Sequence, residues 1–314
     1  MKNAMDAAQQ LEGCCSLLRE LQNSDGGWGF QPQARSRVEP TCWAHRALAN
    51  AKNPNDTGPL SRARKYLRSA QLPDGSWPAT PEMRTGSWVT SLVCAILSQD
   101  AEAASAALRG LEWLCEDFPR DSSLFLRLLR RLWPGPNVDE QDDALRGWGW
   151  SPRTSSWVEP TAFALMAMQE FAETQLPALA RRRRELAVKL LYDRMCPGGG
   201  WNCGNPRVYG VDGESLVLPT AWALLALRRE PEHKRKTLSL AWLAAEFPKI
   251  ESPASLAVAS VCLETYGRAL PWAKRELLDF RAEELACDGI HVLAWNCLAL
   301  NKNRGWPGRR GELN

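Results

Sequence analysis

The sequence predicts an all-α fold in which six inner and six outer helices form a closed double ring, an (α/α)6 toroid, as one domain over residues 1–314. Three observations predict this fold: turn segments containing Gly-Trp recur along the chain, strongly apolar segments follow them, and amphipathic segments precede them. Alternating runs of Val, Ile and Thr, which would indicate strands, are not found. A chain of 314 residues with 45% hydrophobic content is long enough to fill such a core.

The turn segments provide the repeat. Residues 22–28 and 71–77 both read Gln-x-x-Asp-Gly-x-Trp, and weaker copies occur at 146–150, 198–201 and 304–307. The key tryptophans are separated by 49, 71, 53 and 105 residues. Because the last interval is about twice the others, we expect one unit to lack its Trp, which makes about six units of roughly 50 residues. In a closed ring, Trp306 at the end of the chain would complete the packing of the first unit.

The apolar segments that follow the turns are predicted to form the inner ring. Three of them, starting at Val38, Val158 and Val217, carry Pro at the third position and Thr next to it. Proline is accepted in the first turn of a helix, and a helix that is apolar on every side must be buried on every side. The other three inner helices are expected within residues 86–97, 253–263 and 289–300.

The amphipathic segments, at 60–70, 178–195 and 233–247 among others, are predicted to form the outer ring. The basic run Arg181–Arg184 falls in one of them and is expected to be a solvated face, with contact to anionic lipid as the alternative. A peripheral membrane contact therefore remains open at this stage.

Composition excludes several function classes. A net charge of +3 does not favour nucleic acid, and no stretch of about 18 apolar residues predicts a transmembrane segment. The first residues lack the apolar core of a secretory signal. Ten cysteines are scattered through helical segments without a disulfide framework, which is typical of a reducing cytoplasmic compartment. We expect a cytoplasmic protein without a cofactor.

The Gln-x-x-Asp-Gly-x-Trp segments resemble the QW repeats of squalene-hopene and related terpenoid cyclases and the repeats of protein prenyltransferase β-subunits. The resemblance extends from about Leu11 to Pro307 and is specific for the fold rather than for an activity. It implies that the repeat Gln and Trp tie outer helices together. It also implies, as our leading hypothesis, a class II cyclase that encloses a linear polyprenyl chain and protonates it. Squalene-type cyclases use two such rings, whereas this chain has the length of one.

The family's proton donor lies in an Asp-x-Asp-Asp-Thr-Ala motif at the start of an inner helix. Aligning that motif with Thr161-Ala162 makes Glu159 the catalytic acid, although Trp157 and Pro160 replace the flanking acids. A carboxylate at a helix start is favoured in its charged form by the helix dipole, so a helix-start role for Glu159 is the alternative.

Three further acids are candidates. Glu39 occupies the same frame as Glu159, with Pro40-Thr41 following it and Cys42 in place of the Ala. Asp142 and Asp143 have the acidic spacing of the motif but precede a Gly-Trp turn, so they are reserve acids or loop residues.

The zinc site of the prenyltransferases matches poorly. Asp288-Gly289-Ile290-His291 resembles the segment that supplies the zinc His, but the Asp-x-Cys pair has no counterpart, and only Cys203, Asp212 and Cys287 are available as substitutes. We therefore predict no metal. A zinc-dependent prenyltransferase β-like subunit remains an alternative function.

Aromatic residues near the predicted inner helix starts are the candidate substrate-binding groups, because aromatic faces stabilise carbocations. With His291 they are Trp43, Trp88, Trp157, Phe163, Trp222 and Trp295. The alternative is that they fill the core of a non-catalytic toroid that binds a lipid or a peptide. Either way, we expect an isoprenoid or another apolar small molecule as the ligand.

Overall fold

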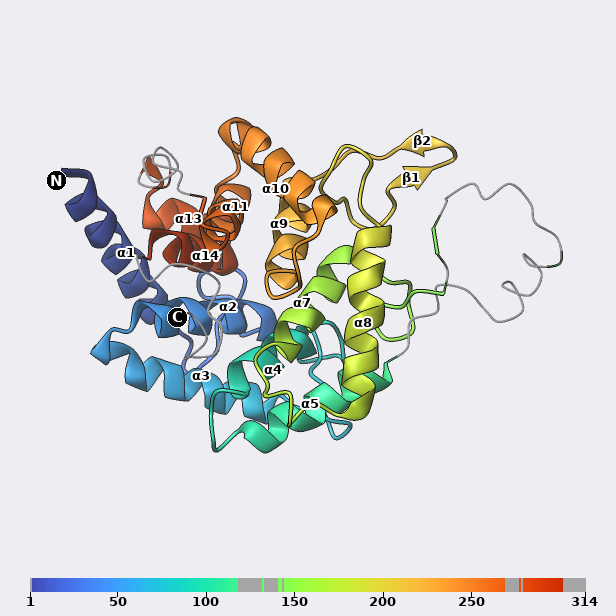
Figure 1. Ribbon diagram of the computed structural model, residues 1–314. Helices are drawn as coiled ribbons and strands as arrows, with labels where there is room; N and C mark the ends of the chain where they lie inside the picture. The colour runs from blue at the N-terminus through green and yellow to red at the C-terminus, as the bar shows by residue number, and fades with distance from the viewer. Residues whose placement is uncertain are drawn as a thin grey trace.

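Six inner helices form a closed ring in the computed structural model, which describes residues 2–117, 132, 141–142, 144–268, 277 and 279–301 (Figure 1). Each inner helix packs against the next, and the last packs against the first. In chain order they are α2 (Val38–Ala51), α4 (Val89–Leu97), α7 (Val158–Met168), α9 (Val217–Ala226), α11 (Pro253–Thr265) and α14 (Ile290–Leu300). The contact between α14 and α2 closes the ring and confirms the predicted toroid.

Six outer helices surround this ring and alternate with the inner ones along the chain. They are α1 (Lys2–Glu20), α3 (Thr57–Ser69), α5 (Ala104–Glu116), α8 (Ala178–Asp193), α10 (Lys234–Glu246) and α13 (Ala282–Asp288). The inner helices are buried nearly all round, whereas the outer ones bury one face. Two short 3-10 helices, η1 (Pro54–Asp56) and η2 (Phe247–Lys249), lie between longer elements. In the described residues no helix has the length and apolar character needed to cross a bilayer.

The turn tryptophans are held by the inner helices that follow them. The backbone N–H of Trp28 donates to the hydroxyl of Thr41 at 2.9 Å, and its indole Nε1–H donates to the carbonyl of Leu18 at 2.8 Å. The same pair of hydrogen bonds recurs at Trp77, Trp148 and Trp201, with Thr90, Thr161 and Thr220 as the acceptors of the backbone N–H. These tryptophans are buried, so each bond satisfies a polar group that has no access to water.

The repeat glutamines connect neighbouring outer helices. The amide of Gln22, just after α1, donates to the carbonyl of Gly26 at 2.8 Å and to that of Pro59 in α3 at 2.9 Å. Gln71, just after α3, makes the equivalent bonds to Gly75 and to Ala106 in α5. Gly26 has φ +90°, and a Cβ there would lie 2.6 Å from the carbonyl oxygen of Arg62. The turn therefore requires glycine, and the Gln amide ties one outer helix to the next.

One departure from the regular repeat was expected from the tryptophan spacing, and one was not. The connection between α10 and α11 has no Gly-Trp turn, and Phe247 is buried there instead, which accounts for the double interval in the tryptophan spacing. A short hairpin of β1 (Arg207–Val208) and β2 (Val211–Asp212), which the sequence did not predict, projects from the body (Figure 1). Trp306 lies outside the described residues.

The basic run of α8 is not a uniformly solvated face, as the sequence led us to expect. Arg183 is fully buried, with its guanidinium carbon 4.2 Å from the centre of the Trp148 ring. Its Nη2 donates to the carbonyls of Asp117 and Gly147, both at 2.8 Å. Arg181 and Arg182 are exposed. The run therefore divides by helical position: Arg183 holds a Gly-Trp turn, Arg181 and Arg182 face solvent, and the half-buried Arg184 pairs with Glu173 and Glu230.

We predict that Arg183→Ala lowers the free energy of unfolding by about 2–4 kcal/mol, because it leaves two buried carbonyls unpaired and removes the contact with the Trp148 ring. Arg182→Ala is the matched control and should change it by less than about 0.5 kcal/mol. Urea unfolding followed by circular dichroism measures both. Equal effects of the two variants would contradict this role of Arg183.

Candidate functional site

An aromatic cluster fills the centre of the ring about midway along the inner helices, and not at their starts as the sequence analysis expected. Its members, each the sixth residue of its inner helix, are Trp43, Phe163, Trp222 and Trp295. Trp43 stacks on Trp222 with ring centres 5.4 Å apart and meets Trp295 edge-on at 5.5 Å. Phe163 meets Trp222 at 5.2 Å. All four are buried, so the structure brings these predicted residues together as one aromatic cluster.

Further rings extend the cluster on two sides. Trp88 stacks on Phe163 at 5.1 Å and meets Trp150 edge-on at the same separation. On the other side, His291 lies edge-on to Trp295 at 5.0 Å and to Phe30 at 5.7 Å. Phe30 and Trp150 were missed by the sequence analysis, although each lies two residues after a turn tryptophan.

Among the predicted aromatic residues, Trp157 alone makes no ring contact with another described residue. It is 37% exposed, and its backbone pairs with Trp148 just before α7 begins. Its position is at the rim of the ring rather than within the aromatic cluster.

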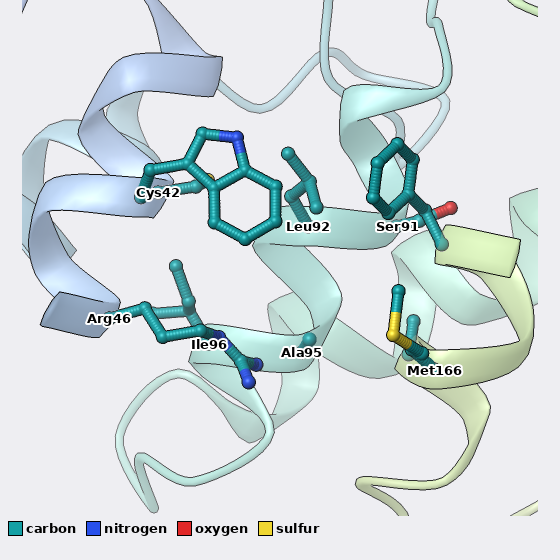
Figure 2. Close-up of a pocket in the computed structure, with 10 residues that line it drawn as sticks. Cys42, Arg46, Ser91, Leu92, Ala95, Ile96 and Met166 are labelled. Carbon is teal, nitrogen blue, oxygen red and sulfur yellow. The ribbon is translucent and has the colours of Figure 1, made fainter. Parts of the chain in front are cut away.

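A cavity of about 10 Å³ lies between α2, α4 and α7 (Figure 2). Cys42, Leu92, Ile96 and Met166 are among the side chains that line it, and Arg46 projects toward it from α2. A cavity of this size holds about one water molecule. A polyprenyl chain therefore cannot occupy it unless the surrounding side chains move.

A buried ion pair lies further along the inner helices than the aromatic cluster. Arg46 Nη2 is 4.0 Å from Glu170 Oε1, and both side chains are nearly inaccessible to solvent. Glu170 Oε2 also accepts a hydrogen bond from Gln99 at 3.4 Å. Burial lowers the pKa of Arg228 to about 10, with the charge of Glu170 opposing that change. The sequence analysis missed this group, for which the signal was the position of Arg46 within an inner helix.

Glu39, in the first turn of α2, is a carboxyl held partly in its neutral form. Burial raises its pKa to about 7. Glu39 lies one helical turn before Trp43, so its carboxyl is on the same face of α2 as that ring of the aromatic cluster.

Glu159 occupies the equivalent position in α7. Burial raises its pKa as well, so the expectation that the helix dipole favours its charged form was wrong. The physical reason is desolvation: the loss of water around a half-buried carboxyl outweighs the attraction of the helix N-terminus. Glu159 lies near Cys203, whose carbonyl accepts a hydrogen bond from Val158 N–H at 3.1 Å.

The reserve acids are elsewhere. Asp142 is exposed, and its Oδ1 accepts a hydrogen bond from the backbone N–H of Ala144 at 2.8 Å, which is the role of a turn residue. Asp143 lies outside the described residues.

The four residues considered for zinc are not brought together. Asp212 pairs with Arg207 at 2.6 Å in the hairpin, Cys287 is exposed on α13, and His291 faces aromatic rings. Burial lowers the pKa of His291. In the part of the chain that the structure describes, no group of three or more His, Cys, Asp or Glu side chains is arranged to hold a metal ion.

Comparison with known proteins finds partial similarity to terpenoid cyclases. The chain is 37% identical over 75 residues to drimenyl diphosphate synthase from Streptomyces showdoensis and 32% identical over 82 residues to lanosterol synthase from Homo sapiens. The matches cover 24% and 23% of this chain but only 14% and 11% of those relatives, and no family model matches.

Solved structures share the ring. The type II terpene cyclase MstE from Scytonema, in complex with geranylgeranyl dihydroxybenzoate, superposes with a TM-score of 0.55 at 16% identity, over 94% of this chain and 79% of that one. An α-1,6-mannanase from Salegentibacter superposes with a TM-score of 0.59 at 9% identity, over 93% of this chain and 99% of that one. Since both activities occur on this fold, the fold by itself does not decide between them.

The raised pKa of Glu39 predicts a specific pH dependence of stability. Between pH 4.5 and about 7 the folded protein holds a proton that the unfolded chain releases, so stability falls as pH rises through this range. Between pH 5 and pH 8, wild type should lose on the order of 2 kcal/mol more unfolding free energy than Glu39→Gln, whose amide does not titrate. Urea unfolding at both pH values measures this difference. Identical pH dependence of the two proteins would show that Glu39 titrates normally.

Proposed function

We propose that this ring is a class II isoprenoid cyclase that protonates a linear polyprenyl chain, and that Glu39 is the proton donor. The observation that supports this most is the position of Glu39: a carboxyl with a pKa raised to about 7, one helical turn before Trp43 of the aromatic cluster. A neutral carboxyl beside electron-rich rings is the combination that generating a carbocation requires.

The reaction follows from these groups. The O–H of Glu39 donates its proton to a terminal C=C bond, whose π electrons form the new C–H bond and leave a tertiary cation. The next double bond attacks that cation, and each attack forms one C–C bond and moves the positive charge along the chain. Loss of a proton to water ends the sequence with a double bond, and protonation of the Glu39 carboxylate restores the acid.

The aromatic rings near Glu39 assist the stages that follow proton transfer. The faces of Trp43, Trp222 and Phe163 supply negative electrostatic potential to the cation, worth about 0.5–2 kcal/mol for each ring. Since these rings contact one another, the substrate must part the aromatic cluster before it reaches the acid.

Glu159 is the second candidate for the acid. Burial raises its pKa too, and Phe163 lies one helical turn beyond it as Trp43 does beyond Glu39. We rank it below Glu39 because the pKa of Glu39, at about 7, departs further from the ordinary value of a carboxyl. The exposed carboxyl of Asp142 has no part in this proposal.

A structural relative was solved with an isoprenoid substrate. The alignment to the Scytonema cyclase in complex with geranylgeranyl dihydroxybenzoate covers 94% of this chain and 79% of that one, so most of that cyclase has a counterpart here. This supports a polyprenyl substrate.

The second candidate function is non-catalytic binding of an apolar molecule. It is favoured by the departure of the helix start from the family motif, in which Trp157 and Pro160 replace acidic residues beside Glu159. It is also consistent with the closed aromatic cluster.

We expect Glu39→Gln to reduce the rate of cyclisation at least 100-fold, because it removes the transferable proton while keeping the size of the side chain. Glu159→Gln is the matched variant and should retain activity within about tenfold. The assay incubates each protein with geranylgeranyl diphosphate and identifies cyclic products by mass spectrometry.

The outcomes separate the candidates. Full activity in Glu39→Gln together with loss of activity in Glu159→Gln would identify Glu159, in α7, as the proton donor. Absence of product from wild type, together with an apolar molecule extracted from the purified protein, would favour the binding function. Circular dichroism of each variant confirms that the ring remains folded.

A further inference from the structure

Exposed apolar side chains gather beside the β1–β2 hairpin. Five of the eight large apolar side chains exposed in the described part of the chain lie on or next to it: Val208, Tyr209, Val211, Leu216 and Leu238. Tyr209 and Val211 are 86% and 71% exposed. Single exposed apolar residues need no explanation, but a contiguous group indicates a surface that meets another apolar phase.

The hairpin presents these side chains away from the body. Tyr209 and Gly210 occupy its two turn positions with φ of +51° and +79°. A turn of this kind favours Asn or Gly at both positions, and a bulky aromatic residue at positive φ is uncommon. The turn therefore tolerates backbone strain while holding a tyrosine in solvent, at the tip that projects from the body in Figure 1.

A basic cleft adjoins the hairpin. It has a volume of about 700 Å³ and lies between the start of β1 and the start of α10. Arg207, Lys234 and Arg235 line it together with Leu238, Pro197 and the acidic Asp193. Apolar and cationic side chains thus share one surface.

The charges on this surface leave a positive excess. Arg207 pairs with Asp212 at 2.6 Å, and Asp193 lies 3.4 Å from Arg194. Neither Lys234 nor Arg235 has an acidic partner within 4.0 Å in the described residues, although Arg235 donates to the carbonyl of Tyr192. Two cations therefore remain uncompensated beside the exposed hairpin tip.

We propose that the hairpin tip and the basic cleft dock the protein on an anionic lipid bilayer. Val208, Tyr209 and Val211 would enter the headgroup region, and Lys234 and Arg235 would meet lipid phosphates. This combination of an apolar tip and adjacent cations matches a membrane surface, which presents negative charge over a hydrocarbon layer.

The position of this surface links it to the mouth of the ring. The hairpin lies in the connection between Trp201 and α9, so it is at the end where the inner helices begin, as is Glu39. The same connection contacts the start of α7 through the hydrogen bond from Val158 to Cys203. Docking would therefore place the mouth beside the membrane. The docking itself needs no substrate and stands apart from the proposed chemistry.

The test is sedimentation with vesicles of phosphatidylcholine and phosphatidylserine at 7:3, compared with pure phosphatidylcholine. Wild type should bind the anionic vesicles more tightly, and added salt should weaken that binding. Lys234→Gln/Arg235→Gln should reduce the affinity by about fivefold per cation, on the order of 30-fold together. Tyr209→Ser/Val211→Ser should reduce binding at least tenfold.

The matched control is Arg181→Gln/Arg182→Gln, which removes the same charge from the exposed arginines of α8 and should bind as wild type. Equal binding to neutral and anionic vesicles, or unchanged binding by the tip variant, would overturn the proposal. The proposal would also be overturned if wild type does not bind vesicles but forms a concentration-dependent dimer, seen by light scattering, and the tip variant does not form that dimer. Because no substrate is present, these outcomes are independent of whether cyclisation is found.

Discussion

The hydrogen bond between each turn tryptophan and the threonine of the following inner helix determines the geometry of the site. Thr41 accepts from the backbone of Trp28, and two residues later Trp43 enters the aromatic cluster. The same interval separates Thr161 from Phe163 and Thr220 from Trp222. Because the threonine fixes where each helix begins, it also fixes which side chain points to the centre of the ring. The buried hydrogen bond between tryptophan and threonine in each turn therefore helps to position the rings of the aromatic cluster.

How far the sequence could predict this structure depended on the range of the interaction. The ring followed from the repeated turns and from helices apolar on every side, because both are local patterns. The inward position of Trp43 and Trp222 followed from their place near helix starts. The burial of Arg183, in contrast, depends on how α8 packs against the turn at Trp148, which a charge run does not reveal. The pairing of Arg46 with Glu170 joins different units and has no local signal.

The acid shows the same distinction. The sequence placed Glu39 and Glu159 at equivalent helix starts, and the helix dipole alone argued for two ionised carboxylates. Burial reverses that expectation for both, and it raises the pKa of Glu39 to about 7. The hairpin escaped prediction because each of its strands is only two residues long, too short for an alternating pattern. Sequence similarity to cyclases covers about a quarter of the chain, so the choice between chemistry and binding rests on these few side chains.

One turn shows how independent the units are. In three of the turns the indole N–H reaches a carbonyl ten positions earlier in the chain, whereas Trp148 reaches Leu114, 34 positions earlier. The bond itself, at 2.8 Å, is unchanged by the extra chain between its partners. The connection between an outer helix and the next inner helix therefore accepts inserted residues while this hydrogen bond is kept. Grafted loops at this position offer a route to alter what the protein recognises while its architecture is conserved.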